Sequence, residues 1–272
     1  MTQESSLAVL GAGNIGTAIA RGLARASRGG AEQLILTRRH PDALSELRKA
    51  GFQTLQDNRA AVERVDTVLV AVQPQQLNAL LDEIRPVLDP ARHAVISVVS
   101  GASIAAIGVR IGDSVPVVRA MPNVAMAVGR SMTCLAAQTR EEPALKVAQE
   151  IFETVGTTLV IDEEQMVPAT ALCACGIAFF LRAIRAASQG GIEIGFHPEE
   201  ALSMAAQTAL GAATLTLEMG QHPEREIDTV TTPRGCTISG LNELEHRGFS
   251  SAMIKGILTS AEKAGALYSG SE

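Results

Sequence analysis

A short apolar run followed by three closely spaced glycines constrains the fold of this chain more than any other feature. The run Leu7–Leu10 is typical of a buried strand, the glycines follow in the stretch 11–16, and apolar residues then recur at helical spacing. A strand, a G-x-G-x-x-G turn and a helix in this order form the context of a dinucleotide-binding fingerprint. We therefore predict that a dinucleotide binds at Gly11, Gly13, Asn14, Ile15 and Gly16.

The residues after the next apolar run indicate which dinucleotide binds. Leu34–Leu36 is followed by Thr37, Arg38 and Arg39, and no acidic residue occurs before Asp42. An acidic side chain at this point would suit a free ribose 2′-hydroxyl, whereas two guanidinium groups and a hydroxyl suit a 2′-phosphate. We expect NADP(H) rather than NAD(H) here, with NADH left as an alternative cofactor. The competing interpretation is a solvated basic turn that binds nothing.

The first part of the chain alternates strand-like and helix-like segments, which predicts a mainly parallel, doubly wound sheet of the Rossmann type. The expected strands are Leu7–Leu10, Leu34–Leu36, Thr67–Val72, Ala94–Val98, Val115–Arg119, Met132–Ala136 and Thr157–Ile161. The expected helices are Asn14–Arg28, Pro41–Ala50, Gln75–Leu88, Ile104–Arg110 and Glu141–Val155. These elements place an α/β dinucleotide-binding domain at residues 1–162.

After Ile161 the strand pattern stops, and the remaining sequence predicts helices alone. We expect a long helix over 163–191, then helices at Pro198–Met219 and Pro223–Val230, and two more in the remainder. Small residues on these helices permit close packing, but few large apolar residues are available to form a thick core. Residues 163–272 are therefore predicted to form a helical domain that packs against a second subunit.

Composition and charge restrict the partners. The net charge of −6, the absence of a basic stripe, and only one Tyr and no Trp argue against nucleic acid. The N-terminus lacks a signal-peptide pattern, and we expect the apolar stretch Val167–Leu181 to be too short to span a bilayer. Neither the four cysteines nor the five histidines show metal-ligand spacing. We expect a cytoplasmic protein that binds no metal and no membrane.

Two further strand ends and one helix start carry candidate binding residues. Val72-Gln73-Pro74 and Met121-Pro122-Asn123 end two predicted strands, at the edge where parallel sheets bind ligands. Val72, Gln73, Pro74, Met121 and Asn123 are therefore candidate cofactor residues, although each turn could equally be free of ligand. Near the other end of the chain, the turn 232–235 precedes a predicted helix, whose free N–H groups could hold a carboxylate. An ordinary capped helix start is the alternative there.

With these residues identified, the chain resembles the pyrroline-5-carboxylate reductase family over nearly its whole length. The resemblance is carried by the glycine fingerprint, by 72–75, by 118–123, by the run 162–176, and above all by the stretch 232–241. It implies NADPH-dependent reduction of L-1-pyrroline-5-carboxylate to L-proline, in proline biosynthesis. It also implies a Rossmann domain followed by a helical domain that forms intertwined homodimers, in some members assembled into decamers, with the substrate pocket formed across the dimer.

The same resemblance assigns roles by position. The backbone amides of Gly235, Cys236 and Thr237 would bind the substrate carboxylate, and the Thr237 hydroxyl, as the catalytic group, would lie near the ring nitrogen. Cys175 and Gly176 would lie against the ring. The family usually has Gly where this chain has Arg234, which calls a positive φ at that position into question. It usually has Ser at 173 and 175, where this chain has weaker thiol donors, and Lys at 73, where this chain has Gln.

These departures keep other functions open. The first alternative is a non-catalytic NADP-binding protein on the same fold. The second is a reductase of a related cyclic imine. A β-hydroxyacid dehydrogenase is disfavoured, because Lys146 is the one lysine between Arg140 and Arg182 and it precedes the helical domain.

Overall fold

The structure is a computed structural model that describes residues 7–26, 30–39, 41–140 and 142–269. The chain divides into two compact units. The N-terminal unit comprises Met1–Ala174 together with Ser260–Glu272, and the helical unit comprises Cys175–Thr259. Each unit is described separately below.

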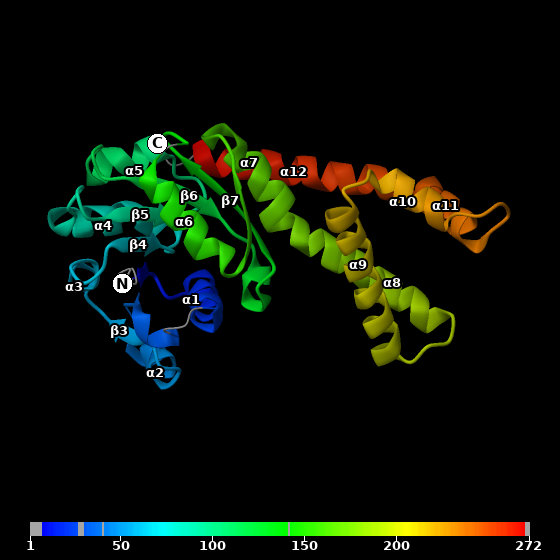
Figure 1. Cartoon of the computed structure of the whole chain (residues 1–272), viewed down its shortest axis with the longest axis horizontal. Helices are drawn as coiled ribbons and strands as arrows, with labels where there is room; N and C mark the ends of the chain where they lie inside the picture. The colour runs from blue at the N-terminus through cyan, green and yellow to red at the C-terminus, as the bar shows by residue number, and fades with distance from the viewer. Residues whose placement is uncertain (1–6, 27–29, 40, 141, 270–272) are drawn as a thin grey trace. The chain divides into compact units, whose positions relative to one another are not determined.

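The N-terminal unit alternates strands and helices, as Figure 1 shows in blue to green. Its strands are β1 (Leu7–Leu10), β2 (Leu34–Thr37), β3 (Gln53–Leu55), β4 (Thr67–Val70), β5 (Ala94–Ser97), β6 (Val117–Met121), β7 (Ser131–Ala137) and β8 (Gly156–Val160). Its helices are α1 (Asn14–Ala26), α2 (Pro41–Lys49), α3 (Asn58–Val62), α4 (Pro74–Ile84), α5 (Ile104–Ile111), α6 (Pro143–Glu153) and α7 (Met166–Ala169). Short 3₁₀ turns at Gly30–Gln33, Arg85–Val87, Val124–Val128 and Glu163–Gln165 complete it.

The strands form one sheet in the order β3-β2-β1-β4-β5-β6-β7-β8. Every strand pairing in the described residues is parallel except that of β6 with β7, which is antiparallel. The chain reverses its direction of winding beside β1, because β2 pairs on one side of it and β4 on the other. Such a switch point leaves a crevice at the carboxyl ends of β1 and β4, where open α/β sheets bind ligands.

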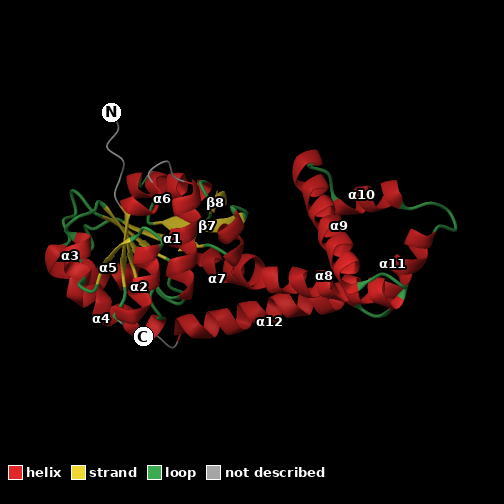
Figure 2. Cartoon of the chain, turned by 90° about the horizontal axis from the view of Figure 1, so that it is seen from below, coloured by secondary structure: helices red, strands yellow, loops and turns green. Residues whose placement is uncertain are grey.

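Both faces of the sheet are covered by helices, so alternate residues of one strand enter two different cores. In β1, Leu7 and Val9 pack with α1, α2 and α6, whereas Ala8 and Leu10 pack with α3, α4 and α5. Figure 2 shows the strands in yellow between these helices. The apolar runs expected from the sequence are therefore strands buried on both faces, and the doubly wound Rossmann-type sheet is confirmed.

The helical unit contains α8 (Gly176–Glu193), α9 (Pro198–Met219), α10 (Pro223–Val230), α11 (Cys236–His246) and the first part of α12 (Phe249–Ser269). α8 packs against α9, and Gly191 allows the close approach, since a Cβ there would lie 3.0 Å from Cβ of Ala201. Among the described residues of this unit, Ala201 is the one hydrophobic residue that is buried. Its large apolar side chains are mostly exposed, for example Leu217 at 84% and Ile194 at 78%.

An ion pair between a buried arginine and a half-buried glutamate fixes the chain where the strands end. The carboxylate of Glu163 accepts hydrogen bonds from Nη1 of Arg119 on β6, at 2.9 Å, and from the backbone N–H of Ile104 at the start of α5, at 2.7 Å. The Arg119 side chain is 4% exposed, and its burial lowers its pKa while Glu163 opposes that shift. Glu163 therefore ties the segment after β8 to two elements of the sheet domain.

The elements with strong periodicity lie within a few residues of their predicted positions, and α9 and α10 have the predicted bounds. Two elements are absent from the prediction, β3 and α3, because both are short and β3 is a partly exposed edge strand. The predicted ends at Arg28 and Glu141 lie outside the described residues.

The long helix predicted over 163–191 is present as a continuous helical run, 163–193, but its geometry is not α-helical throughout. The segment begins as a 3₁₀ turn, continues through α7, passes through a π-helical stretch at Thr170–Cys175, and only then becomes α8. The hydroxyl of Thr170 donates to the carbonyl of Met166 at 2.8 Å, and Pro168 carries no N–H, so the regular helical bonding is altered here.

The apolar stretch Val167–Leu181, which is expected to be too short to span a bilayer, lies inside a longer helical run. The helical run Glu163–Glu193 is long and apolar enough to cross a membrane, and 11% of its most apolar window is buried. Helices of this kind also occur in soluble proteins, so the finding is weak evidence for a membrane span. It does show an apolar surface that this chain does not cover by itself.

Candidate dinucleotide and substrate sites

The glycine loop between β1 and α1 lies against the ends of two neighbouring strands. The N–H groups of Gly11 and Ala12 donate to the carbonyl of Thr37 at the end of β2, at 3.3 and 2.8 Å. Gly11 has φ +98°, and a Cβ there would lie 2.7 Å from Val72 and 2.8 Å from the carbonyl of Ala71, just after β4. Only glycine fits this conformation in this space.

The other two glycines differ in what surrounds them. A Cβ on Gly16 would collide with the carbonyl oxygen of Gly11, so glycine is required for α1 to pack on the loop. A Cβ on Gly13 would meet nothing within 4 Å, so the backbone there is open to a ligand. Asn14 and Ile15 are exposed at the start of α1, where the first N–H groups of a helix have no intrahelical acceptor. These contacts fit a diphosphate at the helix N-terminus.

Of the residues after β2, Arg38 lies closest to this loop. Its Nη1 donates to the carbonyl of Ala12 at 3.1 Å, and its side chain is half-buried. Arg39 is exposed. Thr37 is buried, and its hydroxyl donates to Oδ1 of Asn58 at 2.6 Å, so this hydroxyl is already engaged within the protein.

A cavity of about 550 Å³ continues from the loop along α1. Gly13, Asn14, Thr17, Arg21, Arg25 and Arg38 line it, together with Glu46 and Leu47 of α2. The sequence reasoning missed Arg21 and Arg25. Their spacing from Asn14 and Thr17 places them on one helix face with the glycine loop, and this pattern could have identified them. Three arginines thus surround a space suited to an anionic group.

Two more strand ends lie along the same edge of the sheet. Val72 is half-buried beside Gly11, Gln73 is exposed as the N-cap residue of α4 without a capping hydrogen bond, and Pro74 starts that helix. Met121 is buried at the end of β6. The structure therefore brings Val72, Gln73 and Pro74 next to the glycine loop.

The side chain of Asn123 is occupied at both ends. Its Oδ1 accepts from the N–H of Ala125 at 3.0 Å, and its Nδ2 donates to the carbonyl of Cys173 at 3.3 Å. These bonds favour Asn123 as a residue that positions the π-helical stretch. Its contact with the cofactor stays a prediction.

In the helical unit, the predicted turn at 232–235 and the helix start that follows it are both confirmed. Gly235 is the N-cap residue of α11, and the helix begins at Cys236. The side chains of Cys236 and Thr237 are exposed in the single chain, on the turn whose backbone N–H groups lack intrahelical acceptors. This geometry can hold a carboxylate through backbone donors.

The backbone at Arg234 has the positive φ that the sequence called into question. It has φ +59°, and among the described residues it is the one non-glycine residue with a positive φ. The left-handed backbone is therefore kept although the side chain is not glycine. A Cβ on the following Gly235 would collide with the hydroxyl of Thr232, so the turn stays tight.

Cys175 and Gly176 lie at the start of α8, half-buried and buried respectively. Within the helical unit, the loop before α11 lies at the far end from the start of α8 in both views (Figures 1 and 2). Within one chain, the start of α11 and the start of α8 therefore lie apart.

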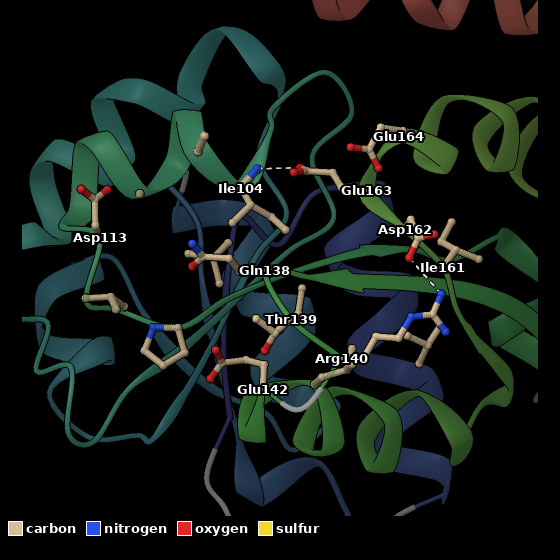
Figure 3. A pocket seen from close by; sticks show the side chains of 18 of the residues that line it. Ile104, Asp113, Gln138, Thr139, Arg140, Glu142, Ile161, Asp162, Glu163 and Glu164 are labelled. Carbon is tan, nitrogen blue, oxygen red and sulfur yellow. Dashed lines mark hydrogen bonds and ion pairs between the residues drawn. The ribbon is translucent and has the colours of Figure 1, made fainter.

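A larger cavity, of about 640 Å³, lies elsewhere in the N-terminal unit, between α5, the start of β6 and the ends of β7 and β8. Figure 3 shows its polar lining, which includes Asp113, Glu142, Asp162 and Glu164. Its arginine, Arg140, is paired with Asp162 at 2.9 Å. An acidic lining disfavours a dinucleotide, so the smaller cavity beside the glycine loop is the better candidate. In the described part of the chain, no three or more His, Cys, Asp or Glu side chains are grouped so that they could hold a metal ion.

The fold and the glycine loop define a Rossmann-type, NAD(P)-dependent oxidoreductase. Comparison with known proteins agrees for both parts of the chain. Residues 6–101 match the family described as NADP oxidoreductase coenzyme F420-dependent, and residues 163–267 match pyrroline-5-carboxylate reductase dimerisation.

Relatives over nearly the whole chain are named pyrroline-5-carboxylate reductase. Reductase 2 of Dictyostelium discoideum is 43% identical, and the alignment covers 97% of this chain and 93% of the relative. Reductase 1 of that organism is 53% identical over 97% of this chain, which spans about half (50%) of that relative's length. The structure of pyrroline carboxylate reductase from Plasmodium falciparum with NADP bound has the same fold, with a TM-score of 0.88, 24% identity, and coverage of 98% and 100% of the two chains. The chain belongs to the pyrroline-5-carboxylate reductase family.

Gly13 and Gly16 provide a matched test of the dinucleotide-binding loop. Gly16→Ala should lower the free energy of unfolding by about 2 kcal/mol or more, because the new methyl meets the carbonyl of Gly11. Gly13→Ala should change it by less than about 1 kcal/mol, yet weaken dinucleotide binding at least about tenfold by filling the space of the diphosphate. Urea unfolding and fluorescence titration measure the two quantities. Unchanged binding by Gly13→Ala would show that the ligand does not approach this loop.

Proposed function

We propose that this protein is a pyrroline-5-carboxylate reductase that reduces L-1-pyrroline-5-carboxylate to L-proline with NADPH, in proline biosynthesis. The observation that carries the proposal is the likeness to a relative of that name over nearly the full length of both chains, at 43% identity. The preserved glycine loop and the preserved helix start at Gly235 support it, because both are built from backbone geometry.

The cofactor site lies in the N-terminal unit. Gly11, Gly13 and Gly16 shape the loop, and the first N–H groups of α1, at Asn14 and Ile15, hold the diphosphate. Arg38 and Arg39 bind the 2′-phosphate, with Thr37 closing the loop through its carbonyl. Val72, Gln73 and Pro74 flank the ribose and nicotinamide, and Met121 and Asn123 support them from the neighbouring strand end. NADH stays an alternative cofactor.

The substrate site lies in the helical unit. The N–H groups around Gly235, Cys236 and Thr237 bind the substrate carboxylate, and the Thr237 hydroxyl hydrogen-bonds the ring nitrogen. Cys175 and Gly176 contact the ring. When bound, NADPH supplies the hydride that reduces the imine carbon. The residues of this chain then have to orient the substrate and exclude water, since hydride transfer to a protonated imine requires no further base.

Self-association completes this site. The separation of the α8 start from the α11 start within one chain, and the exposed apolar side chains of the helical unit, support a homodimer in which a second copy covers this surface. The match of 163–267 to a dimerisation family supports the same arrangement and a domain boundary after residue 162. In this proposal the apolar run Glu163–Glu193 faces protein rather than lipid, and the enzyme is cytoplasmic, with assembly into decamers as a further step.

Turnover is the direct test. The purified protein, given pyrroline-5-carboxylate and NADPH, should oxidise NADPH, as followed by absorbance, and should form L-proline, as identified by chromatography. Binding of NADPH without turnover on this or any other cyclic imine would instead identify a non-catalytic dinucleotide-binding protein. Faster turnover of a different cyclic imine would reassign the substrate.

Thr237→Ala tests the proposed catalytic hydroxyl. We expect kcat to fall about 10- to 100-fold, because one hydrogen bond to a charged group is lost, while NADPH affinity stays within about twofold. Thr237→Ser keeps a hydroxyl and should retain most of the activity. Equal loss of turnover and of NADPH affinity in Thr237→Ala would contradict a role toward the substrate.

Removal of both arginines after β2 tests the cofactor preference. In the double variant Arg38→Ala, Arg39→Ala, the Kd for NADPH should rise about 100-fold or more, because two charge-assisted hydrogen-bonding groups are lost. The Kd for NADH should change less than about threefold. Arg48→Ala, which removes an exposed charge from α2, is the matched control and should leave both values nearly unchanged. Equal weakening of both cofactors would exclude a 2′-phosphate site here.

A further inference from the structure

Two of the four cysteines lie next to each other within the N-terminal unit. Sγ of Cys134, on β7, lies 3.9 Å from Sγ of Cys173, in the π-helical stretch. Cys134 is buried and Cys173 is half-buried, whereas Cys236 is exposed and lies in the helical unit. The mechanism proposed above uses neither Cys134 nor Cys173.

The backbone on both sides of this thiol pair is held in place. Cys134 lies in the sheet between its pairing partners Met121 and Leu159. The carbonyl of Cys173 accepts a hydrogen bond from Nδ2 of Asn123, and apolar neighbours such as Met166 pack around the pair. A disulfide bond needs the sulfur atoms about 2.05 Å apart, so side-chain rotation has to close a gap of about 2 Å.

The two thiols differ in reactivity. The hydrogen bond between the two sulfur atoms lowers the pKa of Cys173 to about 7, against the opposing effect of burial. The same interaction, together with burial, raises the pKa of Cys134. Cys173 is therefore the sulfur placed to react first, because it is the more accessible of the two and has the lower pKa.

We propose that Cys134 and Cys173 form a peroxide-oxidisable dithiol site. The Cys173 thiolate attacks the terminal oxygen of a hydroperoxide, the O–O bond breaks, and the alkoxide or hydroxide that leaves is protonated by water. This gives a sulfenic acid on Cys173. The Cys134 sulfur then attacks the Cys173 sulfur, and the departing hydroxide takes the Cys134 proton and leaves as water. Two thiols and one hydroperoxide thus yield one disulfide, one alcohol (or water) and one further water.

The position of this disulfide implies an effect on activity, an implication that rests on the proposed reductase function. Cys173 precedes the proposed substrate residues Cys175 and Gly176 by two and three positions, and its carbonyl is bound by Asn123. Formation of the disulfide draws Cys173 toward β7 and therefore displaces Cys175 and Gly176. We expect peroxide to lower turnover several-fold and a dithiol reductant to restore it.

Peptide mapping tests the disulfide independently of activity. Trypsin places Cys134 on the peptide 131–140 and Cys173 together with Cys175 on the peptide 147–182. After treatment of the full chain with hydrogen peroxide, and blocking of free thiols, mass spectrometry should find these two peptides joined, with the mass of two hydrogen atoms lost. Reduction should separate them again. If the peptides stay separate while peroxide oxidises Cys236 on 235–247, the proposal is wrong.

Variants assign the sulfur atoms. Cys173→Ser should abolish the joined peptides, whereas Cys175→Ser and Cys236→Ser should both retain them. Joined peptides that persist in Cys173→Ser would show that Cys175 is the partner and would overturn the assignment. Cys134→Ala should leave a sulfenic acid on Cys173, which dimedone traps. This result would show that Cys173 is oxidised first and that Cys134 attacks second. If the peptides join but the protein shows no reductase activity, the dithiol site stands and the proposed function fails.

Discussion

The helical unit does not bury its own large apolar side chains, and this constraint governs the rest of the structure. Phe180, Leu217 and Ile194 are more than half exposed, although burial of each such side chain is worth about 1.5–3 kcal/mol. The five helices therefore depend for stability on contacts beyond their own packing, and a second copy supplies them in the proposed homodimer. The same constraint agrees with the proposed substrate site, in which the starts of α8 and α11 meet across two chains.

The N-terminal unit, in contrast, buries its apolar side chains in a core on each face of its sheet. It can hold its glycine loop rigid, because Gly11 is wedged between β2 and β4 and Gly16 packs on the carbonyl of Gly11. The pair of buried Arg119 and half-buried Glu163 ties the segment after β8 to the same sheet. The rigid glycine loop therefore follows from the core of the N-terminal unit, and the proposed association of the helical unit follows from its exposed apolar side chains.

Periodicity in the sequence predicted most of the fold, since long apolar patterns leave few alternatives for strands such as β1 and helices such as α9. It missed β3 and α3, which are too short for a pattern, and the π-helical stretch, which depends on local bonds of Thr170. The glycine loop was predictable because its motif encodes backbone geometry. The hydrogen bonds of Asn123 were not predictable, because they depend on how distant elements pack, whereas Arg21 was missed although its spacing on α1 places it beside the glycine loop.

The departures from the family pattern are of two kinds: one leaves the backbone geometry unchanged, and the others change the chemistry of side chains. Arg234 stands where the family usually has glycine, yet it adopts the left-handed conformation, so the N–H groups at the start of α11 keep their direction. A carboxylate bound by backbone donors is insensitive to such a change. The thiols at 173 and 175 are different, because they replace hydroxyl donors with weaker ones and add redox chemistry. Since Cys134 already lies within 3.9 Å of Cys173, the substitution at 173 creates a reactive pair that a serine there could not form.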